Sequence, residues 1–148
     1  MKSILSKSTR DELIQRINLL NDQSTAQWGK MNIHQMLKHC ILCEEMFLGK
    51  KKYKQVFIGR IFGKIALKQM LKDEKPLGRK APTGFDFKNL ESSGNLVAEK
   101  DKWISLIGEY ANYSNHDFEH WFFGKMTKEQ VGFFDYKHID HHLRQFNC

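Results

Sequence analysis

The stretch TKEQVGFFDYKHIDHHLRQF, from Thr127 to Phe146, decides the fold that we expect for this chain of 148 residues. Thr127 and Gln130 have the spacing of a capping box, in which each side chain binds a backbone N–H of the other residue at the start of a helix. The helix that begins at this box is expected to last almost to the C-terminus, over residues 127–146. It is the longest helix that the sequence predicts, and it carries an unusual group of histidines.

Three of the seven histidines lie within five positions of this helix, at His138, His141 and His142. Residues four apart lie above one another on a helix, so His138 and His142 share a face while His141 points to the side. Two imidazoles at this spacing can bind one transition metal, provided that a third ligand comes from another helix. The alternative is a polar helix face whose histidines bond to nearby carboxylates, Asp135 and Asp140. The spacing by itself leaves both interpretations open.

Four more helices are predicted from apolar residues that recur every three or four positions. Thr9 and Glu12 form a capping box for the first, and Asn32 and Gly49 are favourable ends for the second. Few segments alternate as strands do. We therefore predict an all-α fold, a single domain over residues 1–148, built as an antiparallel four-helix bundle with an additional short helix and a long loop. The predicted helices cover residues 8–21, 32–49, 96–113 and 127–146 in the bundle and 55–72 beside it, and the loop covers residues 73–94.

A third imidazole for a metal is expected from the second predicted helix, which carries His34 and His39. The two are five positions apart and therefore point to different sides of the helix. His39 lies at the border of the apolar stripe, where it can face His138 and His142 across the bundle. His34 falls in the first turn and is expected to be exposed.

The segment HDFEH, residues 116–120, matches the H-x-x-E-H pattern of one class of metalloprotease. That pattern binds its metal from a helix. Here it follows YSN and precedes WFFG, a context typical of a connection between helices. We therefore do not predict a protease.

The formal net charge of +7 raises the question of a nucleic-acid partner. The sharpest basic cluster is KKKYK, residues 50–54, and the other Lys and Arg residues are spread along the chain. This distribution is typical of a solvated helix end and loop, and no nucleic-acid partner is expected. No apolar run approaches the length that crosses a bilayer, so no membrane partner is expected either.

The N-terminus lacks the apolar segment of a signal peptide. The three cysteines, Cys40, Cys43 and Cys148, are odd in number and predict no disulfide framework. A cytoplasmic protein is the expectation from both observations. Residues 57–71 carry more apolar surface than a peripheral helix needs, which predicts a homodimer.

Three segments resemble an uncharacterised family within the DinB/YfiT-like superfamily of metalloenzymes. The first is QWGKMNIHQMLKHC, from Gln27 to Cys40, and the second is FFGKMTKEQVGFFDYKHIDHHLRQF, from Phe122 to Phe146. The middle segment GRIFGKIALKQMLKDEKP, residues 59–76, looks like the same family. The resemblance implies a four-helix bundle that holds a divalent metal through three histidines.

Carried onto this sequence, the resemblance implies His39, His138 and His142 as the metal ligands, with zinc or nickel as the metal. Members of the superfamily often have His-Arg-Gly-Gln after the last ligand. This chain keeps the glutamine, Gln145, but its arginine is displaced to Arg144.

Four further residues are candidates for roles around the metal. Glu44 is a candidate general base, because a carboxylate near the inward stripe of a helix is costly to bury unless it has a partner or a functional role. His120 is a candidate pocket residue, Asp135 a candidate partner for the second ring nitrogen of His138, and Gln145 a candidate neighbour of the last ligand.

The function that follows from these expectations is that of a metal-dependent enzyme acting on a small molecule, as a hydrolase or a thiol S-transferase. Three histidines leave a coordination position open, as catalytic metal sites do. The alternative is a non-catalytic bundle that binds a metal or a ligand. A nucleic-acid binder is the third hypothesis, and it would require a steep salt dependence of binding.

Overall fold

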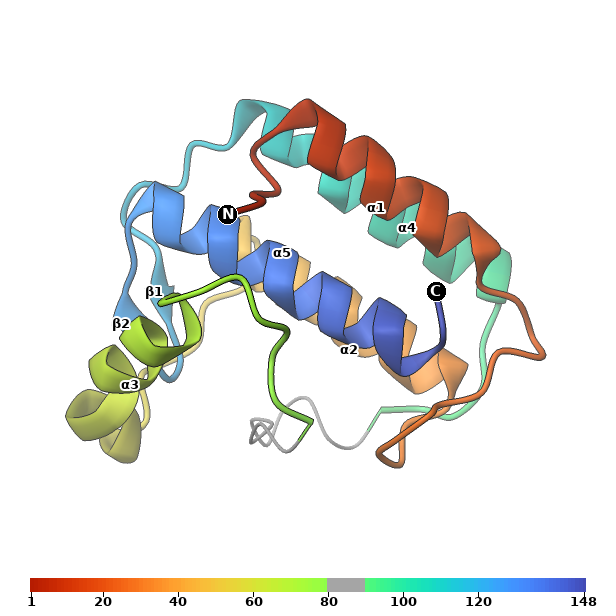
Figure 1. Cartoon of the computed structure of the whole chain (residues 1–148), viewed down its shortest axis with the longest axis horizontal. Coiled ribbons are helices and arrows are strands. Elements are labelled where there is room, and N and C mark those ends of the chain that lie inside the picture. The colour runs from red at the N-terminus through yellow and green to blue at the C-terminus, as the bar shows by residue number, and fades with distance from the viewer. Residues whose placement is uncertain (80–89) are drawn as a thin grey trace.

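The computed structural model describes residues 1–79 and 90–148, and this part of the chain is mostly helical, as expected (Figure 1). A short 3₁₀ helix follows α4, and the only sheet in the described residues is one antiparallel pair of two-residue strands. None of the described helices is long and apolar enough to cross a membrane. The elements are α1 (Lys7–Leu19), α2 (Ile33–Phe47), α3 (Phe57–Met70), α4 (Leu96–Glu109), η2 (Tyr110–Asn112), β1 (Glu119–His120), β2 (Gly124–Lys125) and α5 (Lys128–Gln145).

Four helices share the main apolar core. The helix α4 packs against α1 and α2, and α5 packs against the same two helices. The fifth helix, α3, contacts β2 and lies at one end of the molecule (Figure 1). Trp103 of α4 is completely buried among these four helices, as are Leu13 and Ile17 of α1 and Met36 and Leu37 of α2.

The predicted capping boxes have different outcomes. Asn32 and Gln35 form a complete box at the start of α2, and Thr127 and Gln130 form one at the start of α5. The box predicted from Thr9 and Glu12 is wrong, because α1 already begins at Lys7 and Thr9 is buried inside it. No side chain caps the start of α1.

The long loop after α3 begins against α5. Lys137 of α5 is buried, and its ammonium donates to the carbonyl oxygens of Met70 and Asp73 at 2.6 and 2.7 Å. These two bonds fix the end of α3 and the first residues of the loop. The remainder of the predicted 73–94 loop lies partly outside the described residues, which resume at Leu90.

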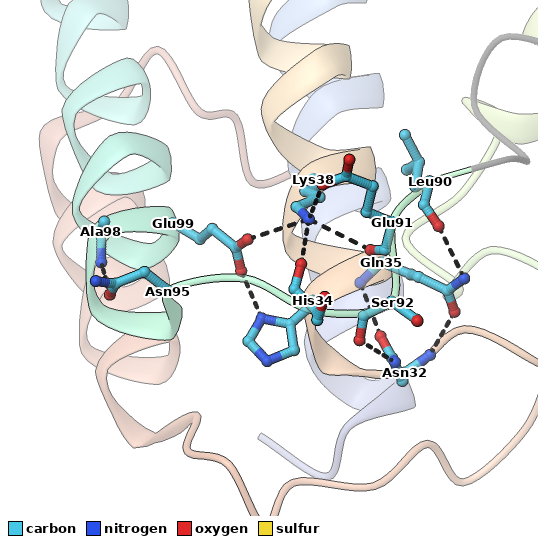
Figure 2. Close-up of polar contacts among 11 residues, drawn as sticks. Asn32, His34, Gln35, Lys38, Leu90, Glu91, Ser92, Asn95, Ala98 and Glu99 are labelled. Carbon is cyan, nitrogen blue, oxygen red and sulfur yellow. Dashed lines mark hydrogen bonds and ion pairs between the residues drawn. The ribbon is translucent and has the colours of Figure 1, made fainter.

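The chain returns from this loop along the first turns of α2 (Figure 2). The amide of Gln35 donates to the carbonyl of Leu90 at 3.0 Å, and that of Asn32 donates to the carbonyl of Ser92 at 2.7 Å. His34 was expected to be exposed, but it is half-buried and its Nδ1 lies 2.8 Å from a carboxylate oxygen of Glu99 on α4. The polar side chains before His39 therefore attach the loop and α4 to α2.

Two glycines explain how α3 is attached to the rest of the protein. Gly59 and Gly63 lie one turn apart on the buried face of α3, and a Cβ at either position would collide with the backbone of Phe122 between the two strands. The sequence indicated only that these glycines weaken the helix. In the structure they allow close contact between two backbones, which no larger residue permits.

We predict that Gly63→Ala destabilises the protein by about 1–3 kcal/mol, because the added methyl group overpacks a backbone contact. Gly108→Ala is the matched control, since nothing lies within 4 Å of a Cβ at that helical position. There alanine should stabilise by up to about 1 kcal/mol through its higher helix propensity. Urea unfolding of both variants measures the difference. Equal effects of the two substitutions would show that α3 does not depend on this contact.

Candidate metal centre

Three histidines from two helices meet inside the protein, as the sequence predicted. His39 comes from α2, and His138 and His142 come from α5. One ring nitrogen of each lies within 4.8 Å of the others, and the Nε2 atoms of His39 and His138 are 3.1 Å apart. Nitrogens that bind one zinc ion at about 2.0–2.1 Å in a tetrahedron lie about 3.3 Å from each other. The spacing therefore suits a shared metal ion.

His141, the remaining histidine of the C-terminal cluster, lies outside this group. Its ring makes an edge contact with the ring of Trp28, with 5.6 Å between the ring centroids. The helical geometry that aligns His138 with His142 turns His141 to the side, as expected from the sequence.

Gln145 fixes the orientation of His142. The amide nitrogen of Gln145 donates to the carbonyl oxygen of Trp28 at 2.7 Å, so its amide oxygen is the atom that lies 2.9 Å from Nδ1 of His142. An oxygen there can only accept, and Nδ1 must therefore carry the proton. The lone pair of the ring is then on Nε2, the nitrogen left for a metal.

A glycine makes this arrangement possible. Gly29 follows Trp28 and has a φ of +82°, and a Cβ there would lie only 2.7 Å from Nε2 of Gln145. A side chain at this position would be strained and would displace the amide that orients His142.

Burial keeps the three imidazoles uncharged. It lowers the pKa of His39 to about 4 and those of His138 and His142 well below their usual range, with the neighbouring imidazoles contributing. Neutral imidazole is the form that binds metals. The group therefore consists of three neutral nitrogen donors at neutral pH, which fits a divalent transition metal.

The histidines line a cavity of about 510 Å³, which is the size of a small-molecule site. Aromatic and thioether side chains form much of its wall, and Lys30 and Arg79 are its cationic members. The guanidinium of Arg79 lies 4.4 Å from the ring centroid of Trp28. No carboxylate lines the cavity in the described part of the chain. The apolar wall is formed by Met31, Met46, Phe47, Met70, Leu77, Trp121, Phe122, Phe123 and Phe134.

Several of these cavity residues were not predicted. Cys43 lies one turn after His39, and its Sγ is 3.8 Å from Nε2 of that histidine. The helical spacing from His39 could have identified it. Lys30 and Arg79 lie in irregular segments, and no periodic pattern indicates where such residues point.

His120 lines the cavity, as the resemblance suggested, but its chemistry differs from that of a base. Its Nδ1 accepts the backbone N–H groups of Phe122 and Phe123 at 3.1 and 3.2 Å, so the proton of the ring is on Nε2. Burial lowers its pKa to about 3. At neutral pH His120 can therefore donate a hydrogen bond from Nε2, whereas its basic nitrogen is already occupied.

Glu44, the candidate general base, lies in the core and does not line the cavity. Trp103 Nε1 and the Tyr110 hydroxyl donate to its two oxygens at 3.3 and 2.7 Å. Burial raises its pKa to about 7, against the effect of those hydrogen bonds. Nothing in this geometry supports a base that reaches the cavity.

Asp135, the candidate partner of His138, forms no hydrogen bond with Nδ1 of that histidine. It interacts instead with Glu44 and Tyr110 in the core. Burial, together with the charge of Glu44, raises its pKa well above the usual range. Asp135 and Glu44 thus form a buried acidic pair between α2 and α5, separate from the cavity lining.

The fold and the site define a mostly helical protein with a three-histidine cluster that lines a cavity. Residues 2–148 match the model of a family described as "Protein of unknown function (DUF1569)", and the chain belongs to that family. No curated protein matches the chain, and no solved structure matches it.

The buried acidic pair generates a prediction for stability. A carboxyl whose pKa is raised by folding stabilises the protein below its unfolded-state pKa and loses that contribution as the pH rises through the folded value. For Glu44 this window runs from 4.5 to about 7. Glu44→Gln should therefore gain stability relative to the wild type as the pH rises from 5 to 8, by up to about 3 kcal/mol.

Urea unfolding of the metal-free proteins at the two pH values measures this difference. The histidines of the site titrate in both proteins, so their effect cancels in the comparison. Glu109→Gln, at an exposed position, serves as the control for the loss of one acidic residue. If Glu44→Gln and wild type differ by the same amount at pH 5 and pH 8, Glu44 is not held in its uncharged form.

Proposed function

We propose that this protein is a metal-dependent enzyme that acts on a small molecule, and that its reaction is a thiol S-transfer. The observation that carries the proposal is the group of three neutral imidazoles at a cavity whose described lining holds no carboxylate. His39, His138 and His142 would hold a divalent cation, zinc or nickel. Such a cation supplies a Lewis acid that lowers the pKa of a thiol and holds the resulting thiolate.

The absence of a carboxylate from the described lining favours this reaction over hydrolysis. Hydrolytic metal sites commonly pair the metal with a general base such as glutamate. The imidazole of His120 is unsuited to that task because its Nδ1 is occupied by two N–H donors. A thiol bound by the metal would lose its proton to solvent, because the cation lowers the thiol pKa, so the thiolate would need no such base. Hydrolysis remains the second reaction to be tested, since the superfamily resemblance suggests both.

The remaining cavity residues have roles that follow from their chemistry. The cations Lys30 and Arg79 attract an anionic group on either substrate, and Nε2–H of His120 can donate to an electronegative atom of the leaving group. The aromatic and methionine walls accommodate an apolar electrophile.

We propose that α1, α2, α4 and α5 form an antiparallel four-helix bundle of the DinB/YfiT-like superfamily, as a single domain over residues 1–148. Each of these helices contacts two of the others, which is the arrangement of a closed bundle. The spacing of the three histidines on two neighbouring helices further supports this relationship.

The first prediction for the site compares two adjacent histidines. His142→Ala should reduce the metal content of the purified protein sharply, because two imidazoles bind a metal far less tightly than three. His141→Ala is the matched control and should leave the metal content unchanged, since His141 lies outside the cluster. Elemental analysis by mass spectrometry measures both. Full occupancy in His142→Ala would disprove the assignment of the ligands.

The second prediction concerns the amide that orients His142. Gln145→Ala removes the acceptor of the Nδ1 proton and should weaken zinc binding by about 10–100-fold, as loss of such partners does at other metal sites. Competition with a chromogenic chelator measures the affinity. Gln69→Ala, at an exposed position on α3, is the control. An unchanged affinity in Gln145→Ala would mean that the amide does not act on the ligand.

The reaction itself is tested with the metal-loaded protein, a panel of small thiols and an alkylating or epoxide electrophile. We expect formation of the thioether, loss of that activity with a chelator, and recovery when zinc or nickel is added back. Ester and amide substrates under the same conditions test hydrolysis. Metal binding without turnover of any substrate in the panel would favour the alternative, a non-catalytic module that binds a metal or a ligand.

A further inference from the structure

The helix α3 exposes an apolar face that nothing in the described part of the chain covers. Phe57 and Ile65 have 76% and 69% of their surface exposed, and each of the other three large apolar residues of this face is more than half exposed. Contiguous exposed surface of this kind marks an interaction site in most proteins. The five residues, which we call the α3 apolar face, are Phe57, Ile58, Ile61, Phe62 and Ile65.

This face is distinct from the surface by which α3 is attached. Gly59, Gly63 and Leu67 are buried, and they recur every four residues along the inner side of the helix. Ile61 and Ile65 are displaced from that line by half a turn and point outward. The apolar residues of α3 therefore serve two surfaces, and the outer one is not part of the core.

Positive charge surrounds the α3 apolar face. Residues 50–72 contain eight Lys and Arg and no Asp or Glu. Of these cations, Lys50 and Lys51 form ion pairs, with Glu109 and Glu45 respectively. Five others form no ion pair within the described residues: Lys52, Lys54, Arg60, Lys68 and Lys72.

Arg60, Lys64 and Lys68 follow one another at intervals of four, so they form a cationic stripe along α3 next to the apolar face. A helix with Phe and Ile on one side and only Lys and Arg on the adjoining side is the type that lies in the interface of a membrane. Clusters of four to eight cations on such a helix favour anionic lipids.

We propose that α3 is a peripheral membrane anchor, which inserts the α3 apolar face among the acyl chains of an anionic bilayer while its cationic stripe contacts the phosphates. The position of α3 agrees with this role, because it lies at one end of the molecule, away from the four packed helices (Figure 1). No membrane partner was expected from the sequence, because no apolar run is long enough to cross a bilayer. A helix that lies on the membrane surface needs no such length, so the proposal departs from that expectation.

A second copy of the chain is the alternative partner for the α3 apolar face, because the same apolar residues predicted a homodimer. Pairing two α3 helices through this face would bring two sets of unpaired cations together, and like charges oppose that contact. An anionic lipid surface neutralises the same charges. The charge distribution therefore favours lipid over self-association.

The proposal is independent of the metal site and is tested by sedimentation with vesicles. The full-length protein is mixed with vesicles of phosphatidylcholine alone or of phosphatidylcholine with one third phosphatidylglycerol. We expect binding to the anionic vesicles, at least tenfold weaker binding to the neutral ones, and weakening of the former by salt. Equal binding to both lipids, or no binding to either, would overturn the proposal.

Variants distinguish vesicle binding through the α3 apolar face from nonspecific adsorption of the protein. Ile61→Asp with Ile65→Asp should abolish binding, and Arg60→Glu with Lys68→Glu should remove the preference for anionic lipid. Leu19→Asp with Val97→Asp is the matched control, since these two residues are as exposed but lie on α1 and α4. Circular dichroism confirms that each variant is folded, which is expected because all of these side chains face solvent.

Light scattering without vesicles tests the alternative, in which a second copy of the chain covers the α3 apolar face. A monomer that binds anionic vesicles supports the proposal. A dimer that Ile61→Asp with Ile65→Asp dissociates, together with no vesicle binding by the wild type, would assign the α3 apolar face to self-association and overturn the membrane role.

Discussion

The desolvation of polar side chains between α2 and α5 is the constraint on which the structure depends. These two helices bury His39 and Glu44 on one side and Asp135, His142 and Gln145 on the other. Burying an ionised group away from water costs free energy. Burial therefore lowers the pKa of each histidine and raises the pKa of each carboxyl, so that the uncharged forms are favoured. The imidazoles become weaker bases and stay uncharged to a lower pH, whereas the carboxyls retain their protons to a higher pH. A core with five titratable or amide side chains thus approaches electrical neutrality.

Neutrality has opposite consequences for the two groups of residues. For the histidines it leaves lone pairs on nitrogen, which is the state that a metal requires. For Glu44 it leaves a carboxyl that accepts hydrogen bonds from Trp103 of α4 and Tyr110 of η2, and so joins α2 to the rest of the core. Asp135 adds a second carboxyl beside the first. The acidic pair is therefore best understood as part of the packing, while the neutral imidazoles are the group that could hold a metal.

The short connection between β1 and β2 links the cavity to α3. The backbone of Phe122 donates an N–H to Nδ1 of His120, and its carbonyl accepts from the side chain of Gln55 at 3.1 Å. The same backbone lies against Gly59 and Gly63. One turn thus sets the tautomer of a cavity histidine and holds the helix that carries the exposed apolar face.

The sequence by itself determined the local features of this protein. Helix periodicity, the boxes at Asn32 and Thr127, and the four-residue interval between His138 and His142 depend on neighbours along the chain, and all are present in the structure. The capping box predicted at Thr9 was wrong because the helix begins three residues earlier, with Ser6 in the N-cap position, which the local pattern did not exclude.

Only the tertiary structure decided which distant groups meet. The carbonyl of Trp28 orients the amide of Gln145, and this amide places the proton of His142 on Nδ1. Asp135 forms no hydrogen bond with Nδ1 of His138, although the two residues are one turn apart on α5. The tertiary structure also turned the glycines of α3 inward and its isoleucines outward, a choice that periodicity leaves open because both faces are apolar. Interactions between segments far apart in sequence have no periodic pattern, since they depend on how the helices pack and not on the spacing within any one of them.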